Sequence, residues 1–155
     1  MNVQQFKAAE KVPLVVVLDN IRSQHNVGSI FRTADAFRLQ GLCLCGLTGC
    51  PPSAEMHKTA LGAEDAVAFL KSGGFTVLAV EQVEGSCPLT DVSVVTGQPC
   101  ALVMGHEVMG VSQAVVDACD GAVEIPQYGT KHSLNVSVSA GIVMWEFARR
   151  IGFAR

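Results

Sequence analysis

The sequence predicts an α/β fold, a mostly parallel sheet with helices on both faces. Short apolar segments rich in β-branched residues, such as residues 14–18 (LVVVL) and 101–104 (ALVM), are typical of strands buried on both faces. Segments in which apolar residues recur at helical spacing lie between them. Because strands that alternate with helices form parallel sheets, we expect five strands in one sheet.

The chain has 155 residues, of which 49% are hydrophobic, enough for one domain with a substantial core. We expect residues 1–12 to form a short polar N-terminal lead-in and residues 13–155 a single domain. The longest apolar runs are far shorter than the roughly 20 residues that span a bilayer, and the N-terminus lacks a signal-peptide core. The sequence therefore predicts a cytoplasmic protein without membrane association.

The net charge of −3 gives no overall attraction to a polyanion, so nucleic acid would have to bind a local patch. Arginines gather in two parts of the sequence, and each group is either a candidate patch for nucleic acid or an ordinary solvated surface. The first group is Arg22, Arg32 and Arg38, and the second is Arg149, Arg150 and Arg155. The six cysteines are expected to be core thiols. Cys43, Cys45 and Cys50 match no common zinc spacing, so we expect no metal site.

In chain order, Pro13 opens the first strand, and a polar loop follows it from residue 19 to 25. Asn26 is expected to cap a helix whose apolar side carries Ile30, Phe31, Ala34 and Phe37. We expect Gly41 to end this helix before a second strand at 42–47.

Pro51-Pro52 breaks the chain, and we expect one or two helices between residues 53 and 71, with His57 on a helix surface. Residues 81–99 are expected to be irregular because glycines and prolines interrupt them. The other expected elements are strands at 75–80, 101–104 and 121–125 and a short helix at 112–118.

The last helix is predicted from residue 133 onward, with Ser133 as its N-cap. Its core stripe repeats at spacings of four, three and four: Val136, Ala140, Val143 and Phe147. Val138, Ile142 and Trp145 lie outside this stripe and require a second buried face. We therefore expect a homodimer that uses this helix.

Three loops, which begin near Asp19, Gly105 and Pro126, each follow an apolar strand. Ligands of open parallel sheets bind at the carboxyl ends of the strands, so these loops are expected to form a site. Small polar residues at 133, 135, 137 and 139 in an otherwise apolar helix favour either a site or a close helix contact. An ordinary strand–loop–helix unit is the alternative for this stretch.

Three motifs occur in order: residues 26–34 (NVGSIFRTA), 102–112 (LVMGHEVMGVS), and 125–129 (IPQYG) followed by 133–137 (SLNVS). Together they resemble the SpoU (TrmH-like) branch of the SPOUT RNA methyltransferases, and the resemblance runs from about residue 13 to 149. It implies transfer of a methyl group from S-adenosylmethionine to a ribose 2′-hydroxyl of RNA. It also implies a SPOUT fold with a C-terminal trefoil knot, and two subunits that complete the site.

The resemblance further implies the residues that bind the methyl donor S-adenosylmethionine. The donor pocket would be lined by Val80, Gly105, Ile125, Ser133 and Leu134, with backbone groups holding the adenine. Asn135 would help to fix the third loop.

The catalytic residues implied by the resemblance are Arg32, Asn26 and Glu107. An arginine is effectively always protonated, so a bidentate grip on the RNA phosphate by Arg32 is easier to defend than a general-base role. Asn26 would organise its loop or cap its helix. Glu107 would orient Asn26 or Arg32, or close its own loop by accepting backbone N–H bonds.

The chain departs from the family pattern in the second motif. His106 stands where the family often has Asn, and Val108 where it often has Gly. Because valine tolerates positive φ poorly, this loop is expected to differ in shape. Tyr128 and His132 are candidates for stacking on a base or are ordinary loop residues, and His25 is placed to touch RNA.

We therefore expect a SAM-dependent RNA 2′-O-methyltransferase that acts on tRNA or rRNA. We expect no appended RNA-binding domain of the kind found in several relatives, so the domain itself is expected to recognise RNA across a dimer. One alternative is a non-catalytic RNA-binding module that keeps the fold. A nucleotide-binding oxidoreductase is disfavoured because no G-x-G-x-x-G turn follows the first strand.

Overall fold

A seven-stranded sheet forms the centre of the protein, here described by a computed structural model over residues 1–49, 57–58 and 62–153. The order across the sheet is β3-β2-β1-β6-β4-β7-β5, and every pairing between these strands is parallel. The strands are β1 (Val12–Asp19), β2 (Leu39–Cys45), β3 (His57–Lys58), β4 (Thr76–Val80), β5 (Cys87–Pro88), β6 (Cys100–Met104) and β7 (Gly121–Glu124). The predicted parallel α/β class is confirmed.

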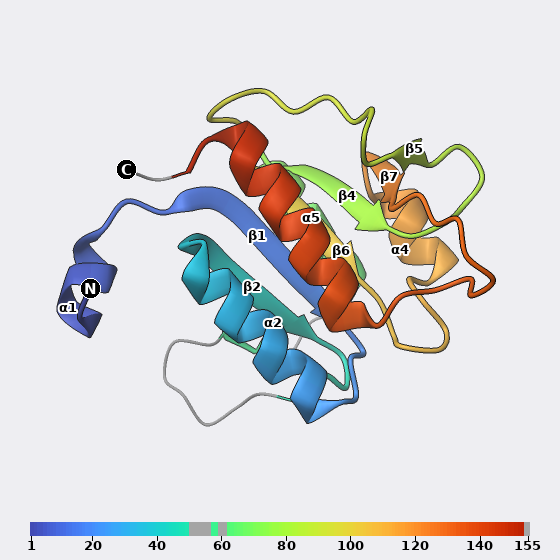
Figure 1. Ribbon diagram of the computed structural model, residues 1–155, viewed down its shortest axis with the longest axis horizontal. Helices are drawn as coiled ribbons and strands as arrows, with labels where there is room; N and C mark the ends of the chain where they lie inside the picture. Colours follow the sequence, from blue (N-terminus) through green and yellow to red (C-terminus); the bar gives the residue numbers. More distant parts are fainter. Residues whose placement is uncertain (50–56, 59–61, 154–155) are drawn as a thin grey trace.

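Helices cover both faces of this sheet. They are α2 (Gln24–Ala36), α3 (Ala63–Ser72), α4 (Gln113–Ala118) and α5 (Val136–Ile151), whereas α1 (Val3–Ala8) lies apart from the sheet near the N-terminus. Figure 1 shows α2 and α5 side by side on one face, where Ile30 and Phe147 belong to the same buried cluster as Leu102. On the opposite face, α3 and α4 pack Val67 and Val115 against the sheet.

The central strands are as apolar as the sequence predicts, because both of their faces are buried. All five residues of β6 are buried, as are seven of the eight in β1. The strands expected at 75–80 and 121–125 and the helix expected at 112–118 are present within one residue at each end. The lead-in is not merely polar chain, since α1 forms there with Asn2 as its cap and no buried residue.

The start and end of α2 differ from the prediction. Ser23, not Asn26, is the N-cap, and its hydroxyl accepts from the backbone N–H of Asn26 at 3.2 Å. The helix ends at Ala36 because Arg38 takes a left-handed conformation with φ of 51°. The chain then enters β2 at once, so Gly41 lies inside a strand, opposite Val15, and does not end the helix.

The start of α5 also differs from the prediction. Asn135 is the N-cap in place of Ser133, because its Oδ1 accepts from the backbone N–H of Ser137 at 2.9 Å and of Val138 at 3.4 Å. The predicted core stripe is confirmed, with all four of its residues buried: Val136, Ala140, Val143 and Phe147.

The region between β2 and α3 is only partly described. The expectation that His57 lies on a helix is wrong, because residues 57–58 pair with β2 as a short parallel strand. Pro51-Pro52 and Cys50 lie outside the described residues. The expected helix ending near residue 71 is present as α3.

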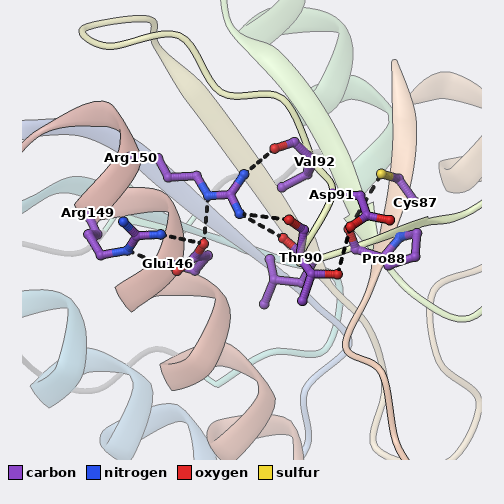
Figure 2. Close-up of polar contacts among 9 residues, drawn as sticks. Cys87, Pro88, Thr90, Asp91, Val92, Glu146, Arg149 and Arg150 are labelled. Atoms are coloured by element: carbon purple, nitrogen blue, oxygen red, sulfur yellow. Dashed lines mark hydrogen bonds and ion pairs between the residues drawn. The ribbon is translucent and has the colours of Figure 1, made fainter.

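Residues 81–99 are irregular apart from the two-residue β5, as predicted, and an arginine of α5 holds their middle in place. Arg150 donates to the carbonyls of Leu89 at 3.2 Å, Thr90 at 3.3 Å and Val92. Figure 2 shows its guanidinium directed at Thr90 and Val92. Arg150 also donates to Glu146 at 2.6 Å. Arg150 therefore has a structural role and is not a free cation of a basic patch.

Two smaller expectations concern cysteines and membranes. Cys43, Cys87, Cys100 and Cys119 carry free thiols, and Cys100 is buried in the core. Among the described helices, none combines the length and apolar character needed to cross a bilayer.

Candidate active site

The site lies at the carboxyl ends of β1, β4, β6 and β7, where the loops after β1, β6 and β7 meet. These loops carry the start of α2, the residues 105–111 after β6, and residues 125–135 before α5. Figure 1 shows the starts of α2 and α5 at the same end of the sheet as the arrowhead of β1. The convergence predicted from the sequence is therefore present in the fold.

Glu107 joins the loop after β6 to the start of α2. Its carboxylate accepts from the backbone N–H groups of Ser23 at 3.0 Å and Arg22 at 3.3 Å, and from Nδ2 of Asn26 at 3.5 Å. Desolvation works to raise the pKa of Glu107, but hydrogen bonds from backbone N–H groups and from Asn26 outweigh it and lower that pKa. Glu107 is therefore held as a carboxylate at neutral pH.

Asn26 continues this chain of hydrogen bonds to α5. It is buried, with 7% of its surface exposed, and its Oδ1 accepts from Nδ2 of Asn135 at 3.2 Å. Since Oδ1 of Asn135 caps α5, one amide pair ties the start of α2 to the start of α5. Glu107, Asn26 and Asn135 thus form one polar chain that joins all three motifs, and we call it the motif bridge.

A pocket beside the motif bridge contains most of the residues expected at the donor. Val80, Gly105, Ile125, Ser133 and Leu134 all line it, and Glu107 lines it as well. Asn135 does not line this pocket but fixes the first turn of α5 next to it.

The wall of the pocket formed by residues 105–111 is tightly folded. A Cβ atom on Gly105 would lie 2.3 Å from the carbonyl carbon of Gly110 and 2.3 Å from the nitrogen of Val111, so only glycine fits there. The carboxylate of Glu81 accepts from the N–H of Val111 at 2.9 Å and so anchors the end of the loop. Sequence reasoning missed Glu81, although its place directly after a strand end was a signal.

Arg32 is not brought to the motif bridge. It is exposed on α2, it does not line the pocket, and it makes no hydrogen bond or ion pair with another residue in the described part of the chain. Of the contacts expected for Glu107, the one to Asn26 is present and one to Arg32 is not. The backbone N–H bonds that it accepts come from Arg22 and Ser23, before α2, and so join two loops. An exposed guanidinium is free to meet a ligand from solution.

The other residues singled out in the motifs lie around the same edge. His106 and His132 line the pocket, whereas Tyr128 is 96% exposed and His25 is also exposed. Val108 does not need positive φ, since Gly110 takes that conformation at 68°. The substitution of valine is therefore accommodated without strain at its own position.

The charges around the pocket suit a cationic ligand. Among the described residues that line it, Glu81, Glu107 and Glu124 supply carboxylates, and there is no lysine or arginine. S-adenosylmethionine carries a positive sulfonium and a positive ammonium against one carboxylate. The charge of the pocket lining therefore fits that donor in sign.

Comparison with known proteins identifies a family for nearly the whole chain. Residues 13–145 match the profile described as the SpoU rRNA Methylase family. The chain is 36% identical over 149 residues to the 23S rRNA (guanosine-2′-O-)-methyltransferase of Nitrosomonas europaea, covering 88% of this chain and 56% of that protein. It is 34% identical to the tRNA (guanosine(18)-2′-O)-methyltransferase of Thermus thermophilus, covering 88% and 75%.

A solved structure supports the same relationship. The AdoMet-bound rRNA methyltransferase of Sinorhizobium meliloti superposes with a TM-score of 0.78 at 28% identity, covering 92% of this chain and 60% of that one. The chain spans only 56% to 63% of the length of several curated relatives that it matches.

Proposed function

Because this chain belongs to the SpoU rRNA Methylase family, we propose that it transfers a methyl group from S-adenosylmethionine to a ribose 2′-hydroxyl of RNA. One observation carries the proposal. The five residues expected to line a donor pocket lie around one pocket, and the motif bridge holds that pocket beside the start of α2. A relative with a similar fold has been solved with AdoMet, which supports the same donor here.

When bound, S-adenosylmethionine supplies a methyl carbon on a positively charged sulfur, which departs as a neutral thioether. The ribose 2′-oxygen forms the new bond to that carbon while the carbon–sulfur bond breaks and its electron pair stays on sulfur. The hydroxyl proton passes to an RNA phosphate oxygen or to water. No strong acid is needed, because the leaving group is neutral.

The task of the chain is then to orient the hydroxyl and to stabilise the negative charge that develops on its oxygen. We assign this task to Arg32, whose guanidinium would bind the RNA phosphate in a bidentate manner. Its exposure and its lack of a partner among the described residues support this role. Glu107 and Asn26 would position the start of α2, and hence Arg32, through the motif bridge.

The exposed side of α5 supports a homodimer. Val138, Ile142 and Trp145 are 50%, 38% and 50% exposed, and they line a hollow of about 640 Å³ whose surface is mainly apolar. Trp145 also packs against Phe37 and Phe153 with its ring tilted to theirs, at ring-centroid distances of 5.6 and 5.3 Å. A second copy would cover this patch, and sedimentation at micromolar concentration should give a dimer; a monomer would contradict the assignment.

The substrate is proposed to be tRNA or rRNA, since one relative carries each in its name. The trefoil knot and a cytoplasmic location remain predictions from the resemblance and the sequence. A structure solved by experiment that traced the chain from β7 to α5 without a knot would refute the first of them.

A transfer assay tests the proposed function. Purified protein is incubated with labelled S-adenosylmethionine and total RNA, taken from cells that contain this gene or from matched cells that lack it. We expect label to enter only the RNA of the deficient cells, because the sites in the other RNA are already methylated. Donor binding without transfer to either RNA would point to a missing partner protein or to an RNA that is not the substrate. Neither binding nor transfer would favour a non-catalytic RNA-binding module.

A further inference from the structure

The loop between β6 and α4 contains a closed turn. The backbone N–H of Gly110 donates to the carbonyl of His106 at 2.8 Å, and these two residues form an isolated antiparallel bridge. Three exposed residues, Glu107, Val108 and Met109, lie between them. We call residues 106–110 the pocket turn, since His106, Glu107, Val108 and Gly110 line the pocket.

The imidazole of His106 fills the inside of the pocket turn. Its Nδ1 accepts from the backbone N–H groups of both Val108 and Met109, each at 3.1 Å. The side chains of these two residues point outward, with 83% and 80% of their surface exposed. A ring nitrogen that accepts two N–H bonds carries no proton, so the neutral ring has its hydrogen on Nε2.

The pocket turn determines where two functional groups lie. Gly105, which precedes it, forms part of the pocket wall, and Glu107 within it is the carboxylate of the motif bridge. Glu81 fixes only the far end, through the N–H of Val111. The rest of the turn is held by the backbone bond from Gly110 to His106, by the bonds that Glu107 accepts, and by the ring nitrogen that His106 offers to two backbone N–H groups.

We propose that His106 is a positioning residue for donor binding, which shapes the pocket turn by accepting two backbone hydrogen bonds through Nδ1. This inference rests on the proposed function, since it takes the pocket to be the donor site. It assigns His106 a role through geometry and not through contact with the reacting atoms.

Two substitutions separate this role from a general need for a bulky side chain. In His106→Asn, the amide oxygen occupies nearly the place of Nδ1 and can accept both N–H bonds. In His106→Gln, the oxygen lies one bond farther out, nearer the place of Nε2, and cannot reach them in the same way. His106→Ala removes the acceptor altogether and is the reference for complete loss.

Donor affinity is measured by calorimetry with S-adenosylmethionine at pH 7.5. We expect His106→Asn to stay within about twofold of the wild type, and the Gln and Ala variants to bind about tenfold more weakly. A tenfold loss corresponds to about 1.4 kcal/mol. The loss is limited because water can replace part of the two hydrogen bonds at an exposed turn.

The results distinguish failure of the role proposed for His106 from failure of the proposed methyltransferase function. If His106→Asn binds as weakly as the Gln and Ala variants, or if all three bind like the wild type, the inference is overturned. If the wild type itself binds no donor, the proposed function fails first, and this inference falls with it. Slow hydrogen exchange at the amides of Val108 and Met109 in the wild type and the Asn variant alone would support it independently of the donor.

Discussion

Replacing Asn135 by alanine should destabilise the protein by about 2 kcal/mol, because one side chain makes two separable contributions. Its Oδ1 caps α5, and loss of such a cap costs about 1 kcal/mol. Its Nδ2 donates to Asn26, which is buried, and loss of that bond costs about another 1 kcal/mol. Asn135→Ser keeps a good cap but is too short to reach Asn26, so it should cost only about 1 kcal/mol.

Urea unfolding of four proteins isolates the second contribution. The set is the wild type, Asn26→Ala, Asn135→Ala and the double variant, and a double-mutant cycle gives the coupling between the two amides. We expect a coupling energy of about 1 kcal/mol. A coupling near zero, or equal losses for Asn135→Ala and Asn135→Ser, would refute the motif bridge as an energetic link. Donor affinity should fall in Asn135→Ala as well, and an unchanged affinity would remove Asn135 from the support of the pocket.

Three further predictions concern catalysis, acid stability and thiol reactivity. Arg32→Ala should abolish methyl transfer, while calorimetry should find the affinity for S-adenosylmethionine nearly unchanged. Arg32→Lys should restore little activity, because an ammonium group cannot make the bidentate contact with phosphate. Loss of donor binding in Arg32→Ala would contradict a role of Arg32 on the RNA side. The pKa of Glu107 is lower in the folded protein than in the unfolded chain. Glu107 therefore stabilises the fold fully above its pKa in the unfolded chain, and this stabilisation is lost as the pH falls through its pKa in the folded protein. The stability difference between the wild type and Glu107→Gln in urea should therefore shrink below about pH 4, and a difference that stays constant down to pH 2 would exclude this linkage. Burial raises the pKa of the Cys100 and Cys119 thiols to about 11, so both are almost entirely protonated at pH 8 and react slowly. Peptide mapping after iodoacetamide treatment of the native protein at pH 8 should find both largely unmodified. Rapid labelling of either thiol would contradict this prediction.

The sequence was most informative where the physics is local. Residues 14–18 and 101–104 are apolar throughout, and the structure buries both faces of these segments in the centre of the sheet. The stripe of α5 that contains Val143 and Phe147 also lies in the core. Burial alone determines such patterns, so periodicity is sufficient to find them.

The helix starts were predicted less well, because the choice between neighbouring polar residues depends on distant partners. Asn26 and Ser23 are both good caps by residue type. Asn26 is instead buried in the first turn, with its amide shared between Glu107 and Asn135, which lie 81 and 109 positions away. No local pattern contains that information.

The candidate site depended on the family resemblance rather than on composition or spacing. The resemblance named six site residues that line the pocket, yet it did not indicate Glu81, whose carboxylate anchors the loop behind Gly105. It also gave no reason for His106. That reason follows from two backbone N–H groups that only the folded turn directs at one ring nitrogen.

The position of the transferred methyl group tests the proposed reaction most directly. RNA labelled by the purified protein is hydrolysed completely in alkali, which cleaves only next to a free 2′-hydroxyl. Methylation of the ribose predicts that the label is recovered in alkali-resistant dinucleotides. Label recovered in single nucleotides would place the methyl group on a base and contradict the proposed function.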